Sequence, residues 1–234
     1  MLEKIILQRN TILLLGGLAI FGGAMSVLAD IYSAYLPNLA MSTATSVSLD
    51  SVANILSAKS HEDHLVGSTL GQFFIPFHIF GWLLLFLALA PANMTLRLLV
   101  LVFSVYITII GASLHASLLY AGAIARSGEQ KIVNQVGEFF NITSYTLVAG
   151  VVIFGCVVAF LILSRRSLYP RWVVLISPLG YLMITTLIVA ALPVTSQSIS
   201  AFITATGFNL PCTLLHIATT VVLLRQSKQP EENS

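Results

Sequence analysis

The feature that most constrains this chain is a series of long windows without Asp, Glu, Lys or Arg. They cover residues 10–29, 65–96, 98–125, 139–164 and 172–224. Each can cross the apolar core of a bilayer, which takes about 20 mostly apolar residues in a helix. Only 9% of the residues are charged and 57% are hydrophobic, whereas a soluble domain has about 25% charged residues. The chain is therefore predicted to be an integral membrane protein.

The last window is too long for one crossing, because residues 172–224 would extend about 80 Å as a single helix. The segment Pro193-Val-Thr-Ser-Gln-Ser has the composition of a turn. We therefore predict an all-α bundle with one domain over 1–225 and six membrane-spanning helices. Their expected ranges are 10–30, 65–90, 95–125, 136–164, 172–193 and 198–224.

The distribution of Lys and Arg predicts the orientation, since positive charge is enriched in cytoplasmic segments. The N-terminus, the second and fourth connections and the tail hold most of the eleven Lys and Arg residues. The other three connections hold only Lys59, Arg126 and Lys131. We therefore expect both termini in the cytoplasm.

The segments outside the predicted spans are short. We expect 31–64 to be an external loop with a short interfacial helix near Val52–Ala58, and 226–234 to be a disordered cytoplasmic tail. Ser60 and Asp63 fit a helix N-cap. Val27-Leu28-Ala29 resembles a signal-peptide cleavage site. The apolar stretch before it is longer than a usual signal sequence, which favours a retained first helix.

Polar side chains within the predicted spans are the candidates for function, because ionisable groups in a membrane usually face the bundle interior. Ser104, Thr108 and His115 share one face of the third helix, and Asn209, Thr213 and His216 share one face of the sixth. The full candidate set for a cavity is Asp30, Gln72, His78, His115, Glu138, Asn141, Asn209 and His216.

Counting residues from the predicted helix ends places His78, His115 and Asn209 at similar depth, about 15–20 Å from the external surface. Asp30 and Glu138 fall near that surface, and His216 lies deeper. The sequence thus predicts an outward-facing funnel with acidic residues at its mouth and the two histidines and Asn209 at its floor.

Several functions fit such a funnel. It could bind, sense or pass a small amphipathic or lipid-like ligand, with membrane lipids as partners. Alternatively, His78, His115 and Asp30 (or His216) could hold zinc for hydrolysis of a lipid, although the His-x-x-x-His spacing of membrane zinc hydrolases is absent. Haem ligation by His78 and His115 is a further alternative. A structural subunit, whose histidines only bond between helices, is the remaining class.

Other classes are excluded by composition. Cys156 and Cys212 lie alone in apolar runs, so neither a disulfide framework nor a cysteine-rich zinc site is expected. The net charge of +2 gives no reason to expect a nucleic-acid partner.

Four motifs in the C-terminal part of the chain carry a resemblance. They are Ser167-Leu-Tyr-Pro-Arg-Trp172, Ser177-Pro178-Leu179, Leu192-Pro193 and Gly207-Phe-Asn-Leu. This pattern resembles uncharacterised bacterial membrane proteins with six helices, grouped only as domains of unknown function. The resemblance implies a bacterial inner-membrane protein and supports Asn209 as a site residue. It implies no activity.

Overall fold

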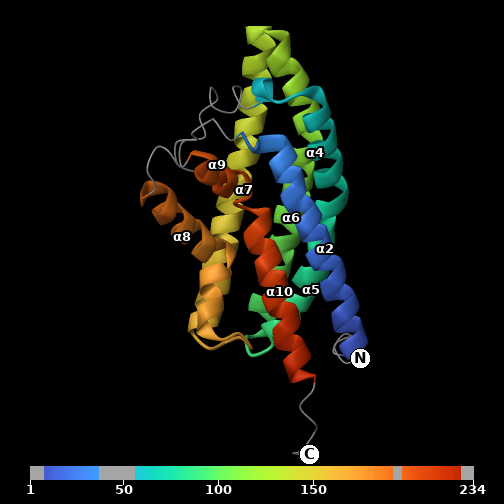
Figure 1. Ribbon diagram of the computed structural model, residues 1–234. Helices are drawn as coiled ribbons and strands as arrows, with labels where there is room; N and C mark the ends of the chain where they lie inside the picture. The colour runs from blue at the N-terminus through green and yellow to red at the C-terminus, as the bar shows by residue number, and fades with distance from the viewer. Residues whose placement is uncertain (1–7, 37–55, 192–196, 228–234) are drawn as a thin grey trace, which may run out of the picture.

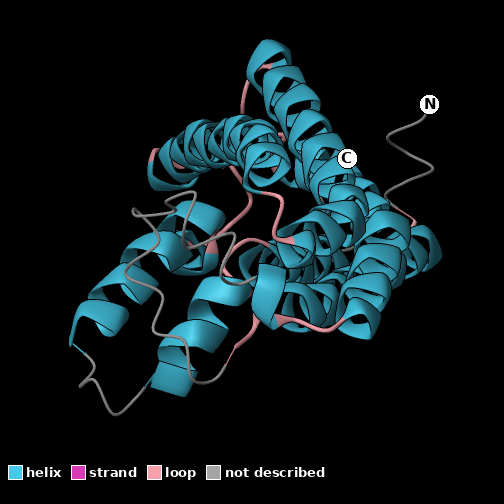
Figure 2. Ribbon diagram, turned by 90° about the horizontal axis from the view of Figure 1, so that it is seen from above, coloured by secondary structure: helices cyan, strands magenta, loops and turns pink. Residues whose placement is uncertain are grey.

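The computed structural model describes residues 8–36, 56–191 and 197–227, and all regular structure within them is helical (Figures 1 and 2). The predicted all-α class is confirmed. The α-helices are α2 (Arg9–Ala34), α4 (His61–Phe74), α5 (His78–Ala88), α6 (Met94–Ser127), α7 (Gln130–Leu163), α8 (Pro178–Ala191), α9 (Gln197–Ala205) and α10 (Asn209–Gln226). Two 3₁₀ helices, η1 (Ile75–Phe77) and η2 (Arg171–Ile176), connect some of them.

Four helical segments in the described ranges are long and apolar enough to cross a membrane. They are α2, the continuous segment His61–Ala88, α6 and α7. The pair α9 and α10 would be a fifth if it is counted as one bent span. The first four predicted spans therefore appear as helices, with ends that differ from the predicted ones by one to six residues.

The helix expected over 172–193 is divided. Residues Arg171–Ile176 form η2, Ser177 is extended, and α8 begins only at Pro178. Proline lacks a backbone N–H and disfavours helical geometry in the residue before it, which explains the division at this point. The 14 residues of α8 extend about 21 Å, which is shorter than the ~30 Å apolar core of a bilayer.

The helix expected over 198–224 is also broken. The axes of its two parts meet at 64°, and the break lies between Ala205 and Asn209. Pro211 cannot donate to the carbonyl of Gly207 and clashes with it in a regular helix, which accounts for the break. Pro76 causes a smaller change, because there the chain continues through the single turn η1.

The loop expected over 31–64 lies largely outside the described residues. Within it, Leu56–Ser57–Ala58 are helical. The predicted N-cap of α4 is confirmed, because Ser60 Oγ accepts a hydrogen bond from Asp63 N at 3.0 Å. The tail expected over 226–234 is described only to residue 227.

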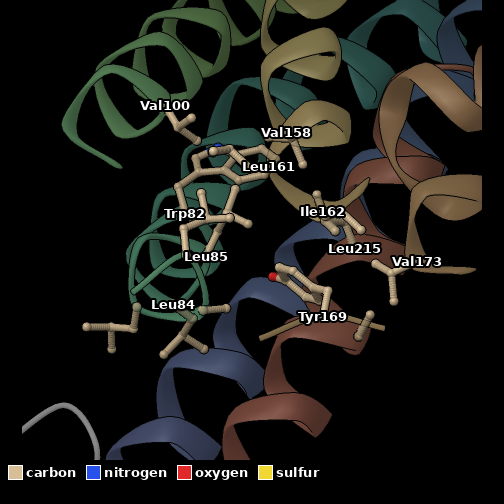
Figure 3. Close-up of a cluster of buried hydrophobic side chains, with 14 of the residues drawn as sticks. Trp82, Leu84, Leu85, Val100, Val158, Leu161, Ile162, Tyr169, Val173 and Leu215 are labelled. Carbon is tan, nitrogen blue, oxygen red and sulfur yellow. The ribbon is translucent and has the colours of Figure 1, made fainter. Parts of the chain in front are cut away.

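The start of α2 and the end of α10 lie at the same end of the bundle (Figure 1). At the opposite end, the hairpin of α6 and α7 extends beyond the other helices (Figure 1). The main hydrophobic core fills the half that contains α5 and the end of α10. Trp82, Leu85, Leu161, Ile162 and Leu215 are all buried there (Figure 3). The remaining half of the interior is less completely filled.

Candidate functional site: a cavity inside the helix bundle

A cavity of about 260 Å³ lies among α2, α5, α6, α7 and the junction of α9 with α10. Most of its lining side chains are apolar, and they include the aromatic rings of Trp82, Phe140 and Phe208. Among the residues that the structure describes, Asp30 is the one acidic side chain in the lining, and no Lys or Arg takes part in it. A mostly apolar hollow with a few convergent polar groups is the usual form of a small-molecule site.

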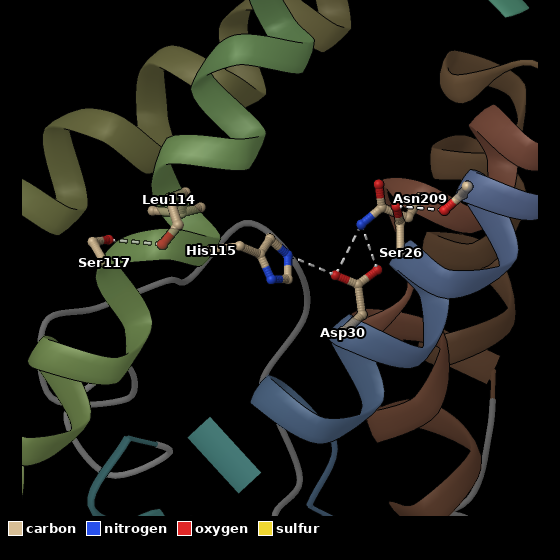
Figure 4. A network of polar contacts seen from close by, with 7 residues as sticks. Ser26, Asp30, Leu114, His115, Ser117 and Asn209 are labelled. Atoms are coloured by element: carbon tan, nitrogen blue, oxygen red, sulfur yellow. Dashed lines mark hydrogen bonds and ion pairs between the residues drawn. The ribbon is translucent and has the colours of Figure 1, made fainter. Parts of the chain in front are cut away.

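Three polar side chains from three helices meet at the wall of this cavity (Figure 4). Asn209 Nδ2 donates to both carboxylate oxygens of Asp30, each at 3.0 Å. His115 Nε2 lies 3.1 Å from Asp30 Oδ1. All three residues are buried. We refer to Asp30, His115 and Asn209 as the carboxylate cluster; it ties α2 to both α6 and α10.

The position of Asp30 corrects the predicted funnel. The sequence placed Asp30 at the external mouth, above His115 and Asn209, but the structure places it in direct contact with both. The difference arises because α2 continues to Ala34 instead of ending at residue 30. The carboxylate therefore lies about one helical turn inside the bundle.

A second polar group lies beside the carboxylate cluster. His78 Nδ1 and His216 Nε2 share a hydrogen bond of 2.8 Å. His78 lines the cavity, whereas His216 lies behind it and is 1% exposed. The ring of Trp82 contacts His216 at a centroid distance of 4.4 Å, and Trp82 Nε1 donates to Thr108 Oγ1 at 2.8 Å. This pair connects α5 to α10, and Trp82 connects α5 to α6.

His115 and His216 each pack against a glycine on a neighbouring helix. A Cβ atom on Gly71 would lie 2.3 Å from His115 Cγ, and one on Gly81 would lie 2.1 Å from His216 Nδ1. Since real Cβ atoms do not approach other atoms so closely, both positions require glycine while the imidazoles stay where they are. The absence of a side chain at these positions leaves the space that the rings occupy.

Three of the predicted site residues lie away from the cavity. Gln72 and Glu138 are exposed, and Asn141 is half-buried and does not line the cavity. On α7 the cavity is lined instead by a helical face that contains Phe140, Ser144, Leu147 and Val151. Glu138 precedes Phe140 by two residues, so it points to nearly the opposite side of the helix.

The ligand set of the zinc alternative is not assembled as one group. His78 pairs with His216, and His115 pairs with Asp30. Within the described ranges, no three His, Cys, Asp or Glu side chains are arranged to hold a metal ion. The pairing of His78 and His115 that haem ligation would need is likewise replaced by these two separate contacts.

The sequence also left contributors to the cavity unrecognised, above all Trp82, Phe140 and Phe208. Trp82 follows His78 by four residues and so lies on the same face of α5, which is a signal that could have identified it. No such signal exists for Phe140 and Phe208, which look like ordinary membrane residues in the sequence.

A turn formed by Leu56–Ser60 covers one side of the cavity through Leu56. His64 Nε2 lies 2.8 Å from the carbonyl oxygen of Leu56, and Arg126 donates to the carbonyl of Lys59. Lys59 Nζ in turn donates to the carbonyl of Ile31 at 3.2 Å. Partial burial lowers the pKa of Lys59, against the opposing attraction of Asp63. These contacts hold the turn against α2 and α6.

A family model matches residues 3–226, a range that includes every helix and the whole cavity lining. The chain belongs to DUF6796, a family of unknown function. The match to DUF6796 extends over the N-terminal helices as well, far beyond the C-terminal motifs that carried the resemblance in the sequence. No curated protein and no solved structure matches the chain.

Proposed function

We propose that this DUF6796 member is a six-span protein of the bacterial inner membrane that binds, senses or passes a small amphipathic or lipid-like ligand. The observation that carries the proposal is the cavity itself, which has mostly apolar walls and contains the carboxylate cluster of Asp30, His115 and Asn209. Such a site suits a molecule with an apolar body and one polar end.

The size of the cavity supports a small ligand. At about 30 Å³ for each water-sized group, a volume of about 260 Å³ accommodates about nine such groups. This corresponds to a short alkyl chain with a polar head, or to part of a longer lipid whose remainder lies outside the cavity.

Ligand binding can be tested by tryptophan fluorescence, because the chain has few tryptophans. It has two tryptophans, of which Trp82 lines the cavity and Trp172 is exposed. In a Trp172→Phe background, Trp82 is the single emitter, and it is 3% exposed. We expect 8-bromooctan-1-ol to quench its emission, because bromine quenches tryptophan only at close range. The quenching should saturate as the concentration of 8-bromooctan-1-ol rises.

Two glycine substitutions provide the matched comparison. A Cβ on Gly111 would meet only Ile75 Cγ2 at 3.7 Å, and Gly111 lines the cavity; Gly111→Leu should therefore fill the cavity and remove the quenching. Gly17 is exposed, with no atom within 4 Å of its Cβ position, so Gly17→Leu should leave quenching unchanged. Equal quenching in both variants would show that the bromoalkane acts from the lipid, and the proposal would fail.

The topology is a separate part of the proposal. Six spans result if α8 and the α9–α10 pair each count as one, and this even number agrees with the start of α2 and the end of α10 lying at one end of the bundle (Figure 1). The distribution of Lys and Arg favours the cytoplasm for that end.

The orientation can be tested by cysteine labelling in a background without Cys156 and Cys212. We expect Glu129→Cys, in the turn between α6 and α7, to react with a membrane-impermeant maleimide in intact spheroplasts. Arg166→Cys, after α7, should react only once the membrane is permeabilised. The reverse pattern would mean that the termini face outward.

A further inference from the structure

We infer that the preferred ligand is a cationic amphiphile, namely a protonated amine on a short apolar chain whose ammonium group pairs with Asp30. This inference rests on the proposed function and names the class of ligand for the same cavity. It follows from the charge of the cavity, from the hydrogen bonds of the carboxylate cluster and from the aromatic rings in the lining.

The charge of the lining is one-sided. Within the described part of the chain, Asp30 is the one acidic residue that lines the cavity, and no Lys or Arg does. The nearby Lys59 directs its ammonium group to the carbonyl of Ile31 and does not line the cavity. The segments 37–55 and 192–196 contain no Lys or Arg. A cationic ligand would therefore supply the positive charge that the lining lacks, whereas an anionic ligand would meet only repulsion.

The hydrogen bonds of His115 favour a neutral imidazole in the cluster. Its Nε2 donates to Asp30 when it carries the ring proton, and its Nδ1 is buried without a hydrogen-bond partner among the described residues. Nδ1 packs toward Gly71. A second proton on the ring would therefore be a buried donor with nothing to accept it, which is costly. With a neutral imidazole, the charge of the Asp30 carboxylate is not cancelled within the cluster.

The Asp30 carboxylate has capacity for a further donor. Two oxygens offer about four lone-pair sites, and three contacts from Asn209 and His115 occupy part of this capacity. Asp30 retains 7% of its surface and lines the cavity. An ammonium group in the cavity can therefore approach the carboxylate without displacing either neighbour.

The aromatic lining favours the same class of ligand. Trp82, Phe140 and Phe208 bring three rings to a cavity whose remaining surface is mainly aliphatic. Aromatic faces attract cations, and they do so more strongly where water is excluded. They also pack against an alkyl chain, so that the same walls suit both the head and the tail of an alkylamine.

The test is a competition with the Trp82 quenching assay, in phosphatidylcholine nanodiscs at neutral pH. The competitors are octan-1-amine, octan-1-ol and octanoate, which share a chain length and differ in charge. We expect octan-1-amine to displace 8-bromooctan-1-ol at about tenfold lower concentration than octan-1-ol, because a hydrogen bond to a charged group contributes about that factor. Octanoate should compete less well than octan-1-ol.

Asp30→Asn provides the matched variant, because it keeps the size of the side chain and removes the charge. We expect it to bring the ratio between the amine and the alcohol close to one. If Asp30→Asn does not fold, the inference is decided by the protein that retains Asp30, from the concentrations at which the three competitors displace 8-bromooctan-1-ol. Gly111→Leu, which should remove the quenching itself, should leave no signal for any of the three to displace.

The outcomes separate the inference from the proposed function. If 8-bromooctan-1-ol quenches Trp82 but the amine competes no better than the alcohol, the cavity binds ligands and the cationic class is wrong. The same conclusion follows if the advantage of the amine persists in Asp30→Asn. If 8-bromooctan-1-ol does not quench Trp82 at all, the proposed function itself is refuted.

Discussion

The substitution Gly81→Ala tests the closest approach between α5 and α10. The added Cβ atom would lie 2.1 Å from His216 Nδ1, 2.3 Å from Cε1 and 2.5 Å from Cγ. Contact at an ordinary distance begins near 3.4 Å, so the imidazole of His216 has to move by about 1.3 Å or the helices have to separate. His216 cannot move freely, because it is bonded to His78 at 2.8 Å and contacts the ring of Trp82.

The expected cost follows from this geometry. Forcing extra volume into a packed interior typically destabilises a protein by about 1–3 kcal/mol. Within a helix, alanine is also about 1 kcal/mol more favourable than glycine. This gain in stability would mask part of the steric cost. Gly17→Ala on α2 is the matched control, because its Cβ has no neighbour within 4 Å. The difference between the two variants should therefore report the steric cost alone.

The measurement is thermal unfolding of both variants in detergent. For a chain of this size, 1 kcal/mol corresponds to a shift in Tm of about 2–4 °C. We expect Gly81→Ala to unfold several degrees below Gly17→Ala, with a changed emission of Trp82 because its contact with His216 is disturbed. Equal unfolding temperatures would refute the close approach of α5 and α10 at this point.

Two further substitutions address the polar contacts. Asn209→Ala removes both amide hydrogen bonds to the buried Asp30 carboxylate and should lower the free energy of unfolding by about 1–3 kcal/mol. The control Asn141→Ala, on a half-buried side chain away from the cavity, should change it by no more than about 0.5 kcal/mol. Equal Tm values for the two variants would contradict the cluster. Thr108→Val leaves Trp82 Nε1 without its acceptor and should lower the Tm by a similar amount, whereas Thr108→Ser, which keeps the hydroxyl, should largely preserve it.

The approximate location of the first four long helices could be predicted because charge-free windows reflect the thickness of the membrane directly. The breaks were harder to locate. Pro76 and Pro211 have the same local effect on a helix, yet one causes a single 3₁₀ turn and the other a bend of 64°. The outcome depends on the packing of neighbouring helices, and the sequence around each proline does not contain this information.

Part of the cavity was also accessible from the sequence. The periodicity of polar residues and the estimated depth brought His78, His115 and Asn209 to one level, and all three line the same cavity. The partner of His115 could not be assigned, because an error of four residues at the end of α2 moves Asp30 by a full helical turn. The two exposed candidates, Gln72 and Glu138, show that a polar residue in an apolar helix does not define by itself which way the side chain points.

The length of the α6–α7 hairpin has a consequence for how the protein meets its surroundings. Each of these helices has 34 residues and extends about 51 Å, whereas the apolar part of a bilayer is only ~30 Å thick. Much of the excess lies at the turn around Gly128, where the hairpin passes beyond the other helices (Figure 1). If the bundle spans a membrane as proposed, this tip extends beyond the apolar layer, and an antibody fragment could bind it without touching the cavity.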